Sequence, residues 1–307
     1  MSAVYETSRY NRRITAIKAI IEPSRIFPRV VTIIHTNSTP ILVDTPKICA
    51  TLTGTTVEEM LADASLATVA GADMVEARLD MLYMEETPVP SDSNDNDQNS
   101  RFRHPETVLT PRNDPDINID EALSLLETGI ELPVVLTCRP MRQGGYFPGT
   151  EEERCAILRK AIESGVSWVD LETDIEPKVR SNLIKLAGKK TSIIASVHFD
   201  RAPDDSDEVI EKVRDMASHG DLVKACYATS GKRSALKLFE AAWELKEEDF
   251  DYTIMGLGEA GDWTRIHAPA IGISMVYTTS ETGPKLTSSG RINTVELTGA
   301  WEMLGYS

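Results

Sequence analysis

Leu222-Val223-Lys224-Ala225-Cys226-Tyr227-Ala228 is an apolar run that holds one charged residue, Lys224. The length and composition of this run are typical of a buried β-strand. Burial disfavours the ammonium form of a lysine and leaves a free amine that can attack a carbonyl group. Lys224 is therefore a candidate Schiff-base nucleophile. The alternative is a lysine on an edge strand whose amine extends into solvent.

A second apolar run, Ser192-Ile-Ile-Ala-Ser-Val-His198, precedes this one along the chain and ends in a histidine. Histidine gains and loses a proton near neutral pH, so His198 is a candidate acid/base. The alternative is a histidine that makes only structural hydrogen bonds. If the two runs are neighbouring strands, they deliver a nucleophile and an acid/base to one place.

The rest of the chain from residue 47 repeats one unit, a short apolar run followed by a longer segment with helical spacing and charged faces. This alternation predicts βα units. The predicted strands are 47–53, 74–80, 133–139, 168–173, 192–198, 221–228, 252–258 and 272–279. The predicted helices begin near Thr56, Asp120, Glu151, Glu176, Asp207, Lys232, Asp262 and Thr294. Glycines fall where five helices should end, in a left-handed cap: Gly71, Gly129, Gly165, Gly188 and Gly220.

Eight βα units over about 260 residues predict an α/β protein with one domain, a closed eight-stranded parallel β/α barrel of the TIM type. A doubly wound open sheet is the alternative. In a barrel the chemistry lies at the C-terminal ends of the strands. Ionisable residues crowd those ends here, which indicates a binding or catalytic site: Glu76, Arg78, Asp80, Arg139, Glu172, His198 and Lys224.

Two segments stand outside the repeat, which we place at 47–307. Residues 1–46 form an N-terminal extension of unknown role, read as a flexible arm, a wrongly assigned start or a targeting peptide. Its apolar stretches are too short to span a bilayer. Residues 84–115 contain the polar tract from Pro90 to Ser100, which predicts a disordered insertion after the second strand.

The chain has 48 acidic and 32 basic residues and a formal charge of −16, which argues against binding to nucleic acids or anionic membranes. The acid excess suits either a high-salt cytoplasm or ordinary solubility. Its four cysteines lack metal or redox spacing and are read as reduced core thiols. The glycines from Gly256 to Gly261 only superficially match a dinucleotide motif. The sequence requires neither a metal nor an organic cofactor.

Seven segments, in order along the chain, resemble the type I 3-dehydroquinate dehydratases of the shikimate pathway. They are Glu76-Ala-Arg78-Leu-Asp80, Thr137-Cys-Arg139-Pro with Gly144-Gly145-Tyr-Phe, Val169-Asp170-Leu-Glu172, Ala195-Ser196-Val-His198-Phe199, Asp221-Leu-Val-Lys224-Ala, Met255-Gly256-Leu-Gly258 and Thr264-Arg265-Ile266. The resemblance runs from about Lys47 to the C-terminus and is interrupted by the predicted insertion.

This resemblance implies a hydro-lyase that removes water from 3-dehydroquinate to give 3-dehydroshikimate. Lys224 would condense with the C3 ketone to form an imine, which acts as an electron sink for a carbanion at C2. His198 would assist imine formation, remove the C2 proton and protonate the departing C1 hydroxyl in a syn elimination. The resemblance further implies a cytoplasmic homodimer in the route to chorismate and the aromatic amino acids.

The resemblance also implies the residues that hold the substrate. Arg265 resembles the family's carboxylate-binding arginine, whose guanidinium makes two parallel bonds. Glu76, Arg78 and Arg139 match positions that hold the ring hydroxyls. Gln143 and Glu172 are expected to support the catalytic pair.

The sequence departs from the family pattern in three places. Gln143 replaces a glutamate beside the catalytic histidine; it can orient the imidazole by a hydrogen bond but cannot stabilise imidazolium by charge, so His198 is expected to titrate lower than in relatives. A Ser-Ala-Pro-Gly-Gln loop is replaced by Glu281-Thr-Gly-Pro-Lys285, in which Lys285 takes the place of a substrate-binding glutamine. The order His198-Phe199-Asp200 is a minor change.

Two rival functions remain open. Another Schiff-base barrel, such as a class I aldolase, shares the need for Lys224 but not for His198 and Arg265 in this register. A degenerate barrel that binds a pathway metabolite without turning it over is favoured by Gln143 and Glu281. A biosynthetic role and a role in quinate degradation both fit.

Overall fold

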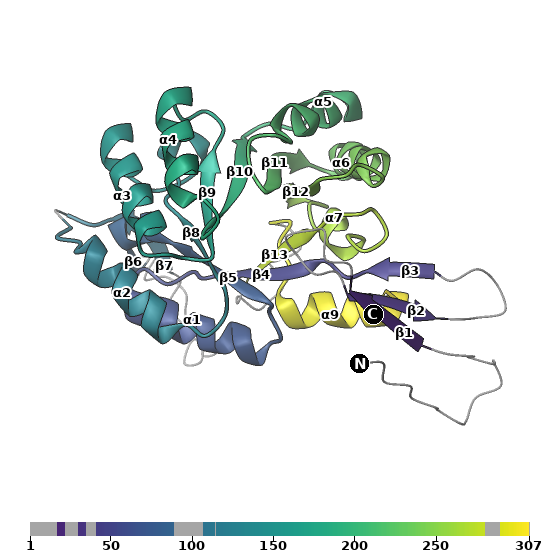
Figure 1. Cartoon of the computed structure of the whole chain (residues 1–307), viewed down its shortest axis with the longest axis horizontal. Helices are drawn as coiled ribbons and strands as arrows, with labels where there is room; N and C mark the ends of the chain where they lie inside the picture. Colours follow the sequence, from purple (N-terminus) through teal and green to yellow (C-terminus); the bar gives the residue numbers. More distant parts are fainter. Residues whose placement is uncertain are drawn as a thin grey trace, which may run out of the picture.

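The described part of the chain in this computed structural model comprises residues 17–21, 30–34, 41–88, 107–113, 115–279 and 289–306, with side chains from residue 45 onward. Within it, parallel strands form an eight-stranded sheet that curls into a nearly closed barrel (Figure 1). The strand order is β12-β11-β10-β9-β8-β5-β4-β13. The bounds are β4 (Lys47–Thr51), β5 (Met74–Arg78), β8 (Val134–Thr137), β9 (Trp168–Glu172), β10 (Ser192–Phe199), β11 (Leu222–Ser230), β12 (Asp251–Glu259) and β13 (Met275–Thr279). The predicted barrel and its eight strands are confirmed.

The ring is least continuous between β12 and β13, which stand at the two ends of the strand order. The N–H of Ser274 donates to the carbonyl oxygen of Tyr252 at 2.9 Å, and the N–H of Tyr252 donates to Ser274 Oγ at 3.4 Å. Both bonds lie near the N-terminal ends of these strands. The C-terminal ends of β12 and β13 are therefore held together by other groups, described with the site below.

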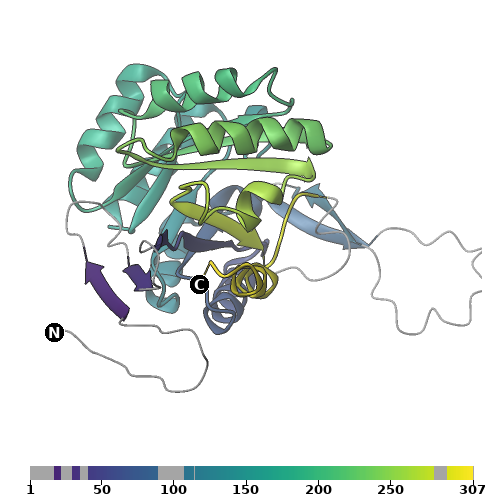
Figure 2. The same cartoon turned by 90° about the vertical axis from the view of Figure 1, so that its right-hand side faces the viewer.

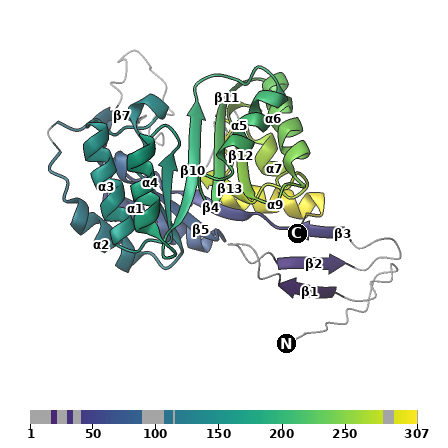
Figure 3. The ribbon, with the colours of Figure 1, turned by 45° about the horizontal axis from the view of Figure 1, so that its top comes forward.

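Helices surround the barrel (Figures 1 and 3). Their bounds are α1 (Val57–Val69), α2 (Ile119–Gly129), α3 (Glu151–Glu163), α4 (Pro177–Ala187), α5 (Ser206–Met216), α6 (Lys232–Leu245), the short α7 (Trp263–Ile266) and α9 (Thr294–Leu304). Each begins within one residue of its predicted start. Thr56 and Thr150 close capping boxes at the starts of α1 and α3, which satisfies backbone N–H groups that a helix leaves unpaired.

The predicted glycine caps are confirmed in part. Gly71, Gly165 and Gly188 have positive φ angles at helix ends. Gly129 and Gly220 do not, so the prediction was wrong for these two. A Cβ on Gly220 would lie 2.8 Å from the carbonyl oxygen of Ile193, so close packing, rather than a left-handed backbone, explains that glycine.

The core has two layers, one between the sheet and the helices and one inside the barrel. The inner layer consists of alternate strand residues: Cys49, Met74, Val135, Trp168, Ile194, Leu222, Cys226, Met255, Met275 and Tyr277. Side chains that are two positions apart on a strand face the same way. Glu76, Asp170 and Lys224 each follow one of these apolar residues by two positions. Met74, Trp168 and Leu222 therefore lie one step below these three charged side chains inside the barrel.

The predicted disordered insertion has structured ends. β6 (Met84–Pro88) and β7 (Thr107–Pro111) form an antiparallel pair that projects from the barrel, in blue in Figure 2. The expectation of disorder was wrong for these ends, which pair over five residues on each strand. The central tract, residues 89–106, lies outside the described residues.

Part of the N-terminal extension forms a separate antiparallel sheet of β1 (Ile17–Ile21), β2 (Val30–Ile34) and β3 (Ile41–Asp44), to one side of the barrel (Figure 3). The other residues before 41 lie outside the described part. The four cysteines are free and buried, as predicted. Among the described residues, no helix has the length and apolar character that crossing a membrane requires.

Candidate active site

A cavity of about 510 Å³ opens at the C-terminal ends of the strands, where the barrel fold predicts a site. It is lined by six of the predicted site residues: Glu76, Arg78, Arg139, His198, Lys224 and Arg265. Gln143 and Glu172 are buried behind it, and Lys285 lies outside the described residues. The β6–β7 pair, read from sequence as disordered, contributes Glu86, Thr107 and Leu109 to the cavity wall.

Lys224 lies at the bottom of this cavity and is almost fully buried. Its Nζ is 3.1 Å from Glu76 Oε1, 3.0 Å from Asp170 Oδ2 and 3.9 Å from the centre of the Tyr277 ring. Burial by itself lowers the pKa of Lys224, but the two carboxylates outweigh it and the pKa is raised. The expectation that burial frees the amine was therefore wrong for the resting protein. Lys224 rests as an ammonium ion.

Glu76 is the carboxylate with the most partners in this cluster. It accepts hydrogen bonds from Thr51 at 3.0 Å and Thr137 at 2.9 Å, and Arg139 Nη2 lies 3.7 Å from its Oε1. Burial opposes ionisation, but the charges of Lys224, Arg139 and Arg78 dominate and lower the pKa of Glu76. Glu76 is therefore ionised and balances the charge of Lys224.

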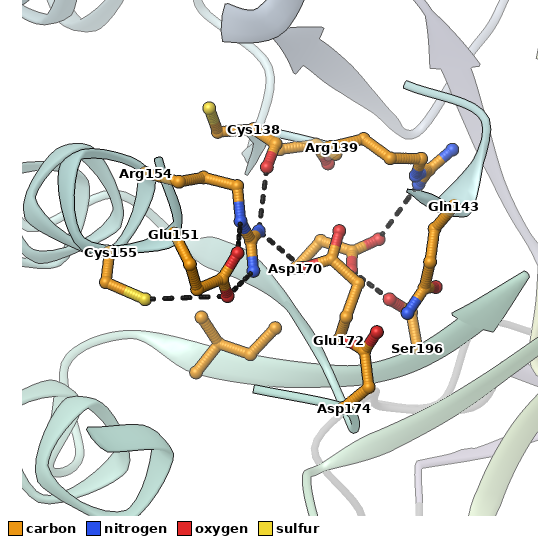
Figure 4. Close-up of polar contacts among 12 residues, drawn as sticks. Cys138, Arg139, Gln143, Glu151, Arg154, Cys155, Asp170, Glu172, Asp174 and Ser196 are labelled. Carbon is orange, nitrogen blue, oxygen red and sulfur yellow. Dashed lines mark hydrogen bonds and ion pairs between the residues drawn. The ribbon is translucent and has the colours of Figure 1, made fainter. Parts of the chain in front are cut away.

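Asp170 completes the cluster and was not among the predicted site residues. It is fully buried, lies 3.4 Å from Arg139 Nη2, and accepts a short hydrogen bond from Ser196 Oγ (Figure 4). The signal was present in the sequence, because Asp170 follows the inward-facing Trp168 by two positions. We call Lys224, Glu76, Asp170 and Arg139 the inner charge cluster.

His198 is held by the side chain of Gln143. Gln143 Oε1 accepts from the backbone N–H of His198 at 3.0 Å and lies 3.2 Å from His198 Nδ1. An amide oxygen cannot donate, so Nδ1 must carry a hydrogen and Nε2 is the basic nitrogen of the neutral ring. Nε2 is buried and has no hydrogen-bond partner among the described residues. The predicted orienting bond from Gln143 is thus confirmed.

The protonation state of His198 complements that of Lys224. Burial lowers the pKa of His198 well below its usual value, and the positive charges of Arg139, Lys224 and Arg78 lower it further. At neutral pH the cavity therefore contains a cationic lysine and a neutral histidine. His198 can accept a proton at Nε2.

Arg78 and Asp80 form a pair at the cavity wall. Arg78 Nε and Nη2 donate to the two oxygens of Asp80 at 2.8 and 2.6 Å, and the N–H of Tyr146 donates to Asp80 at 3.0 Å. Burial raises the pKa of Asp80, but Arg78 outweighs it and the pKa is lowered. This pair fixes Arg78 at the cavity and ties β5 to the loop after β8.

Glu172 pairs with Arg154 of α3, whose Nη1 lies 2.6 Å from Glu172 Oε2 (Figure 4). The same Nη1 donates to the carbonyl oxygen of Cys138 at 2.9 Å, directly before Arg139 in the chain. Burial and the neighbouring charge of Asp170 raise the pKa of Glu172 to about 7, against the opposing effect of Arg154. Glu172 thus supports the strand end that carries Arg139.

Arg265 is buried, and backbone carbonyl groups occupy most of its donors. Nε donates to Tyr277 at 3.0 Å, and Nη1 lies within hydrogen-bonding distance of Gly256, Gly261 and Gly290 at 2.7 to 2.8 Å. Nη2 faces Met255 Sδ at 3.5 Å. The expected pair of parallel bonds to a carboxylate is not available in this arrangement, which leaves Nη2 as the donor for a ligand. Burial lowers the pKa of Arg265 to about 10.

Comparison with known proteins agrees with this geometry. The family model "Type I 3-dehydroquinase" matches residues 48–307. The 3-dehydroquinate dehydratase of Desulfotalea psychrophila is 26% identical over 82% of this chain and 96% of its own length. That of Methanococcoides burtonii is 29% identical over 59% of this chain and 76% of its own.

A solved structure shows the same fold. It is the type I 3-dehydroquinate dehydratase from Clostridium difficile with covalently modified comenic acid, which matches with a TM-score of 0.67 at 21% identity, over 87% of this chain and 96% of that one.

Proposed function

Because this chain belongs to the type I 3-dehydroquinase family, we propose that it dehydrates 3-dehydroquinate to 3-dehydroshikimate through an imine on Lys224. The observation that carries this proposal is the pairing of two residues at one cavity. Lys224 on β11 is buried at the cavity floor, and His198 on the adjacent strand β10 presents an unpaired Nε2. A Schiff-base elimination requires such a nucleophile and such a base.

The first step transfers a proton from Lys224 to the neutral Nε2 of His198, because the ammonium form is not nucleophilic. The free amine then adds to the C3 ketone, His198 returns the proton to the C3 oxygen, and loss of water gives a protonated imine. Glu76 and Asp170, which balance the charge of the ammonium ion, remain in place to balance a protonated imine. The inner charge cluster would thus serve both the resting state and the intermediate.

The elimination then uses one base on one face of the ring. His198 Nε2 removes the C2 proton, and the electron pair enters the imine to give an enamine. The enamine expels the C1 hydroxyl as His198 returns the proton to it, so water leaves and a conjugated imine remains. Hydrolysis of that imine releases 3-dehydroshikimate and restores the lysine amine. Atoms and charge balance over the cycle.

The substrate carboxylate and hydroxyls need charged and polar partners at the cavity wall. We assign Nη2 of Arg265 to the carboxylate, and Glu76, Arg78 and Arg139 to the hydroxyls. The assignment of Lys285 to the substrate stays a prediction. The expectation that His198 has a lower pKa than its counterpart in relatives also stays a prediction.

The first experiment mixes purified protein with 3-dehydroquinate and follows the absorbance of the conjugated enone of 3-dehydroshikimate. We expect the absorbance to rise with wild-type protein and to stay flat with Lys224→Ala. Lys160→Ala is the matched control, because Lys160 is an exposed lysine whose amine pairs with Asp120 at 2.6 Å on the barrel exterior. It should retain wild-type turnover.

A second experiment tests the imine itself. Borohydride added with 3-dehydroquinate should fix a covalent mass on the peptide that contains Lys224, and none on that of the Lys224→Ala variant. Folded protein that binds 3-dehydroquinate but neither turns it over nor gains mass would replace this proposal with the binding-only function. Mass gain from an aldol substrate, with no enone from 3-dehydroquinate, would favour an aldolase.

We further propose the homodimer, the cytoplasmic location and the place in the shikimate pathway that the family implies. Light scattering on the purified protein would test the dimer. Unfolding measured at low and at multimolar KCl would separate a salt-dependent protein from an ordinary acidic one.

A further inference from the structure

We propose that Glu86 is a specificity-determining residue of the candidate active site, and that its carboxylate disfavours ligands with more than one negative charge. Glu86 lies on β6 and lines the same cavity as Lys224 and His198. The inference rests on the proposed function for the identity of the site, but binding measurements test it without turnover.

The β6–β7 pair is anchored where it leaves the barrel. The N–H of Arg112, directly after β7, donates to the carbonyl oxygen of Tyr83, directly before β6, at 2.9 Å. Arg112 Nη2 also donates to the carbonyl oxygen of Thr55 at 3.1 Å. The Tyr83 ring packs edge-on against Phe147, with the ring centres 5.1 Å apart. The base of the pair is therefore tied to the loops that follow β4 and β8.

One face of this pair is turned to the cavity. Residues directly opposite each other on antiparallel strands point to the same side, and the sides alternate along each strand. Glu86 is paired with Leu109, and Pro88 with Thr107. Three of these four residues, Glu86, Leu109 and Thr107, line the cavity. Thr107 Oγ1 donates to Glu86 Oε2 at 3.2 Å, which restrains the carboxylate on that side.

Glu85 belongs to the opposite face of the pair. Its partner is Thr110, one position along from the pairing of Glu86 with Leu109. Glu85 lines a second hollow at the surface and not the cavity that contains Lys224. Glu85 and Glu86 therefore place the same chemical group on opposite sides of one strand.

The cations that line the cavity differ in what balances them. Those of the inner charge cluster have carboxylate partners, and Arg78 is paired with Asp80. Among the described residues, the donors of Arg265 reach carbonyl oxygens and a sulfur atom. Burial lowers the pKa of Arg265, and the charge of Arg291, which also lines the cavity, lowers it further. Asp262 opposes this shift but is not a lining residue. Two guanidinium groups thus make this part of the cavity attractive to anions.

Glu86 is the carboxylate placed to limit that attraction. Glu76 and Asp170 are buried and paired with Lys224, whereas Glu86 is exposed in the cavity wall. Coulomb energy is proportional to the charge of each partner, so a ligand with several negative charges is repelled more than one with a single charge. Glu86 should therefore admit a hydroxylated acid with one carboxylate and disfavour polyanions.

The experiment measures the binding of two probes by titration calorimetry at low salt. Quinate is a cyclic hydroxylated acid with one carboxylate and no ketone, so it binds without forming an imine. Citrate is a tricarboxylate. We expect Glu86→Gln to bind citrate about tenfold more tightly than wild type, and quinate about twofold more tightly.

Glu85→Gln is the matched control, because it removes the same charge from the other face of β6. It should keep both affinities within about twofold of wild type. Salt gives a second readout, since about 1 M KCl screens charges beyond about 3 Å. At that concentration the citrate affinities of wild type and Glu86→Gln should differ by less than about twofold.

Three results would overturn the inference: equal citrate affinities in wild type and Glu86→Gln, equal changes in Glu86→Gln and Glu85→Gln, or no binding of either probe to any of these proteins. Weaker quinate binding by Glu86→Gln would also overturn it, because Glu86 would then accept a hydrogen bond from the ligand. A protein that discriminates against citrate through Glu86 but does not dehydrate 3-dehydroquinate would refute the proposed function alone.

Discussion

The inner charge cluster and the ion pairs of Arg142 with Asp174 and Glu151, which we call the Arg142 fork, both place cations between two carboxylates and differ in burial. In the cluster, Lys224 and Arg139 share Glu76 and Asp170, and the accessible side-chain surfaces lie between 0% and 10%. In the fork, Arg142 shares Asp174 and Glu151 with accessible surfaces near 40%. Water reaches the partners in the fork more readily than those in the cluster. The cluster should therefore contribute more to stability than the fork.

Asp170→Ala should give the largest effect, because it removes one of the two carboxylates that balance Lys224 and Arg139 inside the barrel. We expect a loss of about 3 to 5 kcal/mol in the free energy of unfolding, the usual cost of breaking a buried pair. Urea denaturation measures it.

Asp120→Ala is the control for this variant, since Asp120 pairs with Lys160 at an exposed site. A loss below about 1 kcal/mol for Asp170→Ala would show that water compensates the cluster as it does a surface pair, and the contrast between the two regions would disappear.

Gln143→Glu connects the two regions by placing a negative charge beside His198. Burial and the cations Arg139, Lys224 and Arg78 lower the pKa of His198, so its basic form should persist as the pH falls below 6.5. A glutamate favours imidazolium, and we expect it to move the titration of His198 upward by about one pH unit, equivalent to about 1.4 kcal/mol.

Proton NMR titration of the His198 ring measures both values. The substitution Gln143→Met, which removes the hydrogen bond without adding charge, serves as the comparison. A wild-type midpoint at or above pH 6.5 would contradict the expected effect of burial and of the three cations.

Arg142→Ala should have the smallest effect on stability, despite the four hydrogen bonds that Arg142 donates. Exposed ion pairs contribute about 0.2 to 1 kcal/mol, so we expect a change of less than about 1 kcal/mol in the free energy of unfolding. Denaturation in urea alongside Arg214→Ala provides the check. A loss comparable with that of Asp170→Ala would contradict the small contribution expected of an exposed ion pair.

The fold was predictable because its signal is local and repeated. Each βα unit carries its own apolar run, helix start and terminating segment, so errors at Gly129 and Gly220 did not affect the architecture. The two ends of the insertion, Met84–Pro88 and Thr107–Pro111, were obscured by the polar tract between them.

The sequence predicted most of the residues that form the site. It did not predict all of their charges or hydrogen-bond partners. Lys224 was found from its apolar surroundings, yet its charge depends on Glu76, which is 148 positions away in the sequence. Asp170 could have been found by counting two positions from Trp168. The carbonyl groups that bind Arg265 could not have been found from the sequence. Every residue has a carbonyl group, and the sequence does not indicate which ones converge.

Those carbonyl groups give Arg265 a second task. Its Nη1 reaches Gly256 on β12 and its Nε reaches Tyr277 on β13, the two strands between which the ring is least continuous. Arg265 therefore acts as a clasp between the first and last members of the strand order, close to the mouth. Loosening the clasp would let β12 and β13 move apart and would reshape the opening even for a molecule that never touches the guanidinium.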